Sequence, residues 1–215
     1  MTTPTALWRR WLLAVTAGEA LGFLVPVTAV LLGAGDLPGP AALVVLLAAG
    51  AAEGALLGAA QAAVLAGVLP GLSRRDWTLR TAAAAVVAWS LGMAPSTWAA
   101  AVPGGPLAVR VPLALLAAAL LLTVVGAAQW TVLRRHVPRA GRWIACTALA
   151  WLAGLLVFTA VTTPLWRPGQ APVPVAAIGV LGGLAMALTR AAVTGRGVVV
   201  LLAGRLRRAP AVGAV

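Results

Sequence analysis

Residues 111–133, VPLALLAAALLLTVVGAAQWTVL, carry no charged side chain and end directly before Arg134 and Arg135. An α-helix rises 1.5 Å per residue, so this stretch is about 35 Å long as a helix. The hydrocarbon core of a bilayer is about 30 Å thick and needs roughly 20 apolar residues to cross it. The stretch therefore predicts one membrane-spanning helix, and the rest of the chain can be searched for others.

Five further stretches are long and apolar enough to cross a bilayer. With the first, they are residues 11–33, 42–69, 81–102, 111–133, 143–163 and 173–189. Turn-rich segments separate them, such as Asp36-Leu37-Pro38-Gly39-Pro40 and Pro103-Gly104-Gly105-Pro106. The first stretch follows Arg9 and Arg10 as a secretory signal would, but its apolar part is too long, and we interpret it as a retained helix.

The composition excludes soluble classes of protein. Of 215 residues, 62% are hydrophobic and 9% are charged, and the mean hydropathy is +1.01. Soluble domains are about half apolar and about one-quarter charged. The single cysteine, Cys146, allows no intrachain disulfide. We therefore expect an all-α integral membrane protein with six transmembrane helices.

The arginines predict how the chain threads the membrane. Fourteen lie before the first stretch, between the second and third, between the fourth and fifth, and after the sixth, whereas Arg110 and Arg167 face the other side. Cytoplasmic loops carry the excess of basic residues. The asymmetry predicts that both termini are cytoplasmic, and the net charge of +12 is interpreted as topology and not as nucleic-acid binding.

Three tryptophans mark the cytoplasmic starts of the odd-numbered helices. Trp11, Trp77 and Trp143 each occupy that position, and Arg134 and Arg135 close the fourth helix. Amphipathic rings and arginines favour the headgroup level of a membrane. We interpret these five residues as lipid-interface anchors.

The equal spacing of these tryptophans, 66 residues each time, indicates an internal repeat. Gly58-Ala59-Ala60-Gln61 in the second stretch matches Gly126-Ala127-Ala128-Gln129 in the fourth, and in the sixth Ala185 takes the place of the glutamine. We expect three parallel two-helix hairpins, residues 8–75, 76–142 and 143–197, in one domain over residues 1–197. Residues 198–215 are then a short basic cytoplasmic or interfacial tail.

The run Gly126 to Arg135 fits the pattern G-x-x-Q-W-x-x-L-R-R. It resembles a helix-end motif of small bacterial polytopic membrane proteins that have no established function. The resemblance implies a bacterial inner (plasma) membrane protein and carries no activity with it. The second helix departs from the motif, because Ala62 occupies the position of Trp130.

Two carboxylates, Glu19 and Glu53, fall near mid-depth on adjacent predicted helices. Ionisable groups in a membrane are costly and mark functional sites by default. One interpretation is a proton or cation path, or a site for a cationic solute. A second is two neutral acids hydrogen-bonded to backbone or to threonines such as Thr16, and a third pairs Glu19 with Arg80. Replacement of both by glutamine is expected to leave folding intact and to abolish any transport.

Two glutamines and seven glycines complete the candidate residues. Gln61 and Gln129 either bond across helices or line a vestibule that continues the polar path of the two glutamates. The glycines lie at G-x-x-x-G spacing, which lets helix backbones approach closely, within the monomer or in a homo-oligomer. They are Gly18, Gly22, Gly50, Gly54, Gly58, Gly179 and Gly183.

These features favour a small transporter, channel or permease-like subunit with a polar path on the first two helices. The alternative is a non-transporting scaffold, assembly or immunity-type subunit that binds a protein partner. We expect no enzyme, cofactor or metal site, because the lone His136 lacks a carboxylate nearby in sequence and no ligand cluster is present. The expected partners are the lipid bilayer and either a second copy or another membrane protein, and the substrate stays open. A cavity touching both glutamates would favour transport, and a dry glycine-packed core would favour the scaffold.

Overall fold

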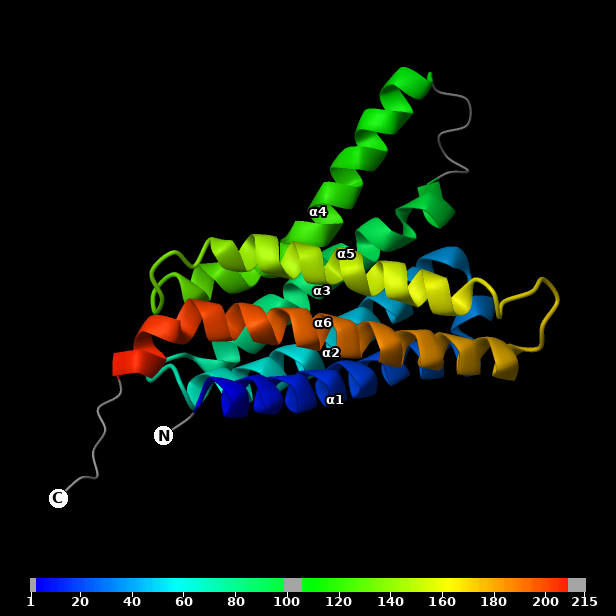
Figure 1. Cartoon of the computed structure of the whole chain (residues 1–215). Helices are drawn as coiled ribbons and strands as arrows, with labels where there is room; N and C mark the ends of the chain where they lie inside the picture. The colour runs from blue at the N-terminus through cyan, green and yellow to red at the C-terminus, as the bar shows by residue number, and fades with distance from the viewer. Residues whose placement is uncertain (1–2, 99–105, 209–215) are drawn as a thin grey trace.

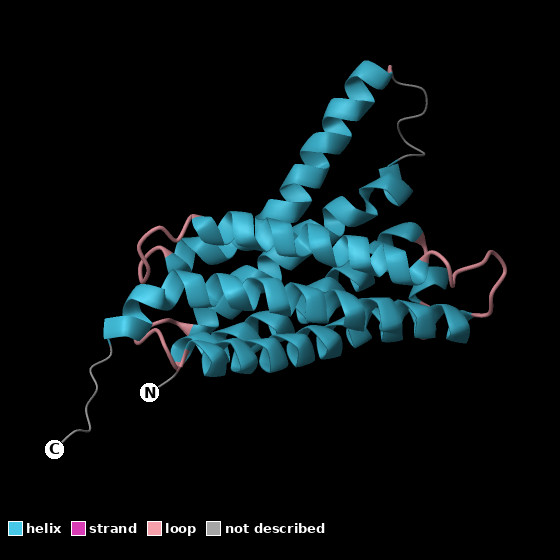
Figure 2. Cartoon of the chain, viewed as in Figure 1, coloured by secondary structure: helices cyan, strands magenta, loops and turns pink. Residues whose placement is uncertain are grey.

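The computed structural model describes residues 3–98 and 106–208, which form a bundle of long helices (Figure 1). The elements are α1 (Pro4–Leu31), the 3-10 turn η1 (Ala34–Asp36), α2 (Gly39–Ala66), α3 (Arg74–Trp98), α4 (Leu107–Leu133), α5 (Arg142–Thr162) and α6 (Pro172–Arg208). The described loops lie at the two ends of the bundle (Figure 2). Predicted residues 99–102 and 209–215 lie outside the described residues.

The helices begin where the sequence supplies caps. Thr3 precedes Pro4 and accepts a hydrogen bond from the amide of Ala6 at 3.2 Å. Ser73 accepts one from the amide of Asp76 at 3.1 Å at the start of α3. Such side-chain caps satisfy amides that have no partner within a helix.

Five of the six long helices are long and apolar enough to cross a membrane: α1, α2, α4, α5 and the part of α6 over Pro172–Gly204. The described part of α3 is not, because it begins with Arg74, Arg75 and Asp76 and also contains Arg80. The chain is thus an all-helical membrane protein with six long helices in its described part.

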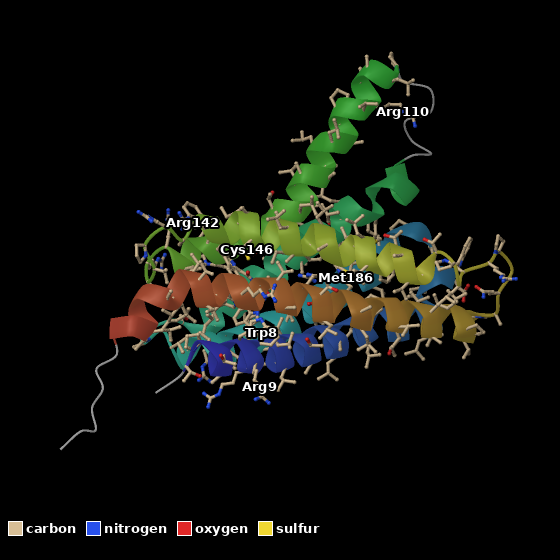
Figure 3. The ribbon with its side chains drawn as sticks, in the orientation of Figure 1. Trp8, Arg9, Arg110, Arg142, Cys146 and Met186 are labelled. Carbon is tan, nitrogen blue, oxygen red and sulfur yellow. The ribbon has the colours of Figure 1, made fainter. Side chains whose placement is uncertain are left out.

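The helices close into a ring. In residues 3–98 and 106–208, each long helix packs against its neighbours in sequence, and α1 also packs against α6. The start of α1 and the end of α6 therefore lie at the same end of the bundle (Figure 1). Trp8, Arg9 and Arg142 lie towards that end, whereas Arg110 lies far from it (Figure 3). We call it the arginine-rich end.

The first half of α4 projects away from the other helices (Figure 1). Its residues are almost all exposed, and the leucines Leu113, Leu115 and Leu116 are 59%, 65% and 57% exposed. Only the second half of α4, from Val125 onward, enters the core. Lipid can cover such a helix because its backbone groups are bonded within the helix.

α6 is longer than predicted. It runs through 37 residues to Arg208, about 55 Å, without ending at Thr189. Val198 and Leu202 are one turn apart on one face and are 3% and 2% exposed. Residues 198–208 therefore continue α6, with Val198 and Leu202 in the core, and the predicted separate tail does not begin at Val198. Arg190 accordingly lies within α6 and not at the end of a helix.

The three tryptophans are core residues, so their interpretation as lipid-interface anchors is wrong. Trp11, Trp77 and Trp143 are 0%, 0% and 1% exposed. The ring centroid of Trp143 lies 5.9 Å from that of Trp11 and 6.3 Å from that of Trp77. Each indole N–H has an acceptor inside the bundle, which removes its need for the headgroup region. Arg134, in contrast, is exposed and lies 4.9 Å over the ring of Trp130, and Arg135 is also exposed.

Candidate functional site: an acidic cavity and a tryptophan–glutamine cluster

A cavity of about 300 Å³ lies between the helices and contains both predicted glutamates. All six long helices contribute to its wall. Its wall includes two carboxylates, two indoles, two phenyl rings and two thioethers: Glu19, Glu53, Trp89, Trp151, Phe23, Phe158, Met93 and Met186. Met186 lies about midway along the bundle (Figure 3). We call this space the acidic cavity.

Glu19 is half of a buried ion pair. Its Oε1 accepts a charge-assisted hydrogen bond from Nη1 of Arg190 on α6, and the two residues are 4% and 5% exposed. The guanidinium of Arg190 also lies 3.7 Å from the ring centroid of Trp151. The predicted pairing with Arg80 is wrong, because Arg80 bonds Asp76 at 2.7 Å near the start of α3.

Glu53 has a different environment. Its Oε2 accepts a hydrogen bond from Nε1 of Trp89 at 3.0 Å. No arginine lies within ion-pair distance of Glu53 in the described chain. The wall of the acidic cavity therefore holds two carboxylates but only one of them has a positive partner.

Close packing of α1, α2 and α3 fixes the position of Glu53 and Trp89. A Cβ atom on Gly22 would lie 3.1 Å from both Cα and Cγ of Glu53, and one on Gly50 would lie 2.4 Å from Cδ1 of Trp89. No side chain larger than hydrogen fits these positions without a shift. Gly22 therefore lets Glu53 pack closely against α1, and Gly50 lets the indole of Trp89 pack closely against α2.

The other predicted glycines divide into packed and open positions. Gly18 faces Ala60 and Leu56 of α2. Gly54 and Gly58 pack against α3, and Gly183 packs against Phe23 of α1. Gly179 has no neighbour within 4 Å of its Cβ position, so it makes no close helix contact within the described part of this chain, and its packing in a homo-oligomer stays a prediction. Gly182 instead contacts Thr162 and Phe158 of α5.

Several buried polar atoms near the acidic cavity have no hydrogen-bond partner among the described residues. They are Oε2 of Glu19, Nε of Arg190 and Nε1 of Trp151. Buried polar atoms are nearly always satisfied by protein or by ordered water. These three atoms are exceptions to that rule, and they are enclosed by protein beside the cavity.

Gln61 and Gln129 lie in a separate hydrogen-bonded cluster towards the arginine-rich end. Nε2 of Gln129 donates to Oε1 of Gln61 at 2.7 Å and to Oγ1 of Thr81 at 3.0 Å. The indole of Trp77 donates to Oε1 of Gln61 at 3.1 Å, and that of Trp143 donates to Oε1 of Gln129 at 2.9 Å. These five residues from α2, α3, α4 and α5 form the tryptophan–glutamine cluster.

This cluster is packed without room for a water chain. The space beside Trp77 and Trp143 measures about 10 Å³ and its other walls are leucine and valine side chains. A water molecule needs at least about 10–15 Å³ and polar partners. Neither glutamine lines the acidic cavity, so the four residues predicted to form one polar path lie in two separate places in this conformation.

α6 contributes the third tryptophan acceptor. Nε1 of Trp11 donates to Oγ1 of Thr194 at 2.9 Å, and Thr194 bonds back to the carbonyl of Arg190 at 2.7 Å. The residue of α6 that accepts the hydrogen bond from Trp11 is therefore Thr194. It lies nine positions beyond Ala185, which the sequence comparison aligns with the two glutamines.

Sequence reasoning missed Arg190, Trp89 and Trp151 as parts of the site. A signal for Arg190 was present, because residues 184–194 contain neither glycine nor proline and give no turn beside it. Nothing in the sequence distinguishes Trp89 and Trp151, which face the cavity, from tryptophans that face lipid.

No protein-family model, curated protein or solved structure matches this chain.

Proposed function

We propose that this chain is a small cation-handling transporter or permease-like subunit, in which Glu53 is the group that binds the transported cation or proton. The observation that supports the proposal is the acidic cavity with one carboxylate, Glu53, that has no positive partner in the described chain. A carboxylate inside a membrane must be protonated, paired with a cation or in contact with water. The first two states place a proton or a cation at Glu53, and the third brings water to the carboxylate; all three fit a carrier site for a cation or proton.

Glu19 has a supporting role in this proposal. Its charge is already neutralised by Arg190, so it positions α1 against α6 and keeps the guanidinium over Trp151. The transported charge then balances Glu53 alone. This assignment divides the two glutamates, which the sequence treats alike, into a structural and a functional group.

The tryptophan–glutamine cluster acts as the closed end of the path. Its indoles and amides satisfy one another, and the space beside them has apolar walls. The conformation is thus closed at the arginine-rich end. In an alternating-access cycle, separation of these hydrogen bonds would open the cavity to that side.

The proposed orientation places the arginine-rich end in the cytoplasm of a bacterium, with α3 as the sixth span. Without Arg190, thirteen arginines belong to that side and Arg110 and Arg167 to the other. Reporter fusions at each terminus of the full chain test the proposal. A pair of termini on opposite faces would contradict it.

The proposed architecture is three parallel hairpins around an axis near the membrane normal. Its support is a hydrogen bond that recurs from the tryptophan near the start of each odd-numbered helix to an even-numbered helix. Trp77 bonds Gln61 of α2, Trp143 bonds Gln129 of α4, and Trp11 bonds Thr194 of α6, which packs against α1. Transporters commonly place their sites where repeats meet. No catalytic role is proposed.

A proton-flux and solute-uptake screen in proteoliposomes tests the function. Wild type is compared with Glu53→Gln, which preserves an oxygen acceptor for Trp89, and with Asp36→Asn, an acid-to-amide control in the exposed turn after α1. We expect flux in wild type and in the control and none in Glu53→Gln. Equal flux in all three would refute the role of Glu53.

A non-transporting scaffold is the second candidate. It is favoured by the dry tryptophan–glutamine cluster and by the exposed first half of α4, which leaves a helix available to a protein partner in the membrane. Absence of any Glu53-dependent flux from the screen would favour the scaffold.

A further inference from the structure

We infer that the acidic cavity binds a hydrophobic organic cation, of the quaternary ammonium class, with its positive centre between the carboxylate of Glu53 and the surrounding aromatic rings. This inference rests on the proposed cation-handling function and names its substrate class. It is drawn from the charge, the wall and the opening of the cavity.

The charge of the wall fits one positive charge. Glu19 and Arg190 neutralise each other, and Glu53 contributes one further carboxylate. An anion would meet this carboxylate without compensation. A monovalent cation makes the cavity electrically neutral, which is the condition for stability in a region of low dielectric constant.

The chemistry of the wall favours an organic cation over a metal ion. Calcium and magnesium need about six oxygen ligands, and no group of three or more His, Cys, Asp or Glu side chains occurs in residues 3–98 and 106–208. The wall instead presents Trp89, Phe23, Phe158 and Met93. Aromatic faces attract quaternary ammonium groups through the cation–π interaction and contact their methyl groups favourably.

The aromatic groups are held in fixed positions. Trp89 is fixed by its hydrogen bond to Glu53 and by its contact with Gly50. Phe23 and Phe158 meet edge to face with centroids 6.4 Å apart. A rigid wall of this kind loses little conformational entropy when a ligand binds.

The cavity is large enough for a small ligand and reaches the membrane-facing surface. Its volume of about 300 Å³ is at the lower end of the usual range for small-molecule sites, about 300–1,000 Å³. Gly92 of α3 lines the cavity, is itself exposed, and has nothing within 4 Å of its Cβ position. α4 adds only Leu121 to the wall, because its first half projects outward. A ligand that partitions into the bilayer can therefore enter beside Gly92.

Binding of benzyltrimethylammonium to the purified full chain in nanodiscs tests the inference, with neopentylbenzene as the uncharged analogue of the same shape. We expect the cation to bind wild type and the Asp36→Asn control equally. In Glu53→Gln its affinity should fall by about 30-fold or more, the loss typical of a removed partner in a buried charge pair. Neopentylbenzene should bind both forms with the same affinity. Equal affinity of the cation for wild type and Glu53→Gln would overturn the inference.

A second variant guards against a folding defect in Glu53→Gln. Trp89→Phe keeps an aromatic face and leaves the carboxylate in place, and we expect about a threefold loss of affinity for the cation. If both variants bind the cation as tightly as wild type, the inference is overturned and the cavity is assigned to lipid.

Gly92→Leu should slow association of the cation without unfolding the chain, since the position is open, and an unchanged association rate would overturn entry at that point.

The binding and flux measurements fail independently. Proton flux that depends on Glu53, without binding of benzyltrimethylammonium, would overturn the substrate class and leave the proposed carrier function intact. Binding that depends on Glu53, without flux of any solute, would support the site and contradict transport.

Discussion

Replacement of Glu19 by glutamine should destabilise the protein far more than the same replacement of Glu53. Glu19→Gln removes the negative partner of Arg190, whose guanidinium is buried mid-helix. Loss of one partner from a buried ion pair costs about 3–5 kcal/mol because the remaining charge is uncompensated. The sequence predicts that folding stays intact when both glutamates are replaced by glutamine; the buried ion pair changes that expectation for Glu19.

Glu53→Gln should be mild by comparison. The amide oxygen of glutamine can still accept the hydrogen bond from Trp89, and no positive charge is left without its partner. Hydrogen bonds between membrane helices contribute about 0.6 kcal/mol on average, so we expect a loss below about 1 kcal/mol. The expected gap between the two variants is therefore about 2–4 kcal/mol.

Reversible unfolding in mixed micelles, followed by circular dichroism as the SDS fraction increases, measures this gap. The double variant Glu19→Gln/Arg190→Met removes both charges and should recover most of the stability lost in Glu19→Gln, because apolar replacement of a whole buried pair is often neutral. Equal stabilities of Glu19→Gln and Glu53→Gln would refute the reasoning. So would a double variant as unstable as Glu19→Gln alone.

Two further predictions concern packing inside the bundle. Gln129→Met removes three hydrogen bonds and leaves the indole N–H of Trp143 without an acceptor, and we expect a loss of about 2 kcal/mol in the same unfolding assay. The control is Thr131→Val, because the hydroxyl of Thr131 bonds only its own helix. A loss in Gln129→Met no larger than in this control would contradict the prediction. Gly54→Ala places a Cβ 2.4 Å from that of Ala85 and forces α2 and α3 apart, whereas the Cβ of Gly179→Ala meets no neighbour. We expect a lower unfolding midpoint for Gly54→Ala only. Equal midpoints of the two variants would count against close packing of α2 and α3.

Hydropathy predicted the helices because it averages over about 20 residues, and lipid requires that length of every span. The predicted second span, residues 42–69, differs from α2 by three residues at each end. The inward face of each helix was not predictable by the same means. In a bilayer the lipid-facing and core-facing sides are both apolar, so the periodicity that marks a buried face in soluble helices is weak.

The same limitation explains the errors at particular residues. Trp11 and its two counterparts lie near helix starts whether they face lipid or the core, and only their acceptors on other helices distinguish the two cases. The sequence predicts a span boundary at Arg190 because basic residues usually flank spans. Its partner Glu19 is 171 residues away and no local pattern connects them. Glu19 and Glu53 were predicted to share an internal site, and both line the acidic cavity.

The closure of α1 against α6 has a consequence for biogenesis. A ribosome adds about 5–20 residues per second, so Glu19 is synthesised on the order of ten to thirty seconds before Arg190. During that interval the nascent chain must carry this acid in its uncharged form or shield it within the insertion machinery. Synthesis of α6 supplies the missing countercharge, so the final docking of α1 waits for α6.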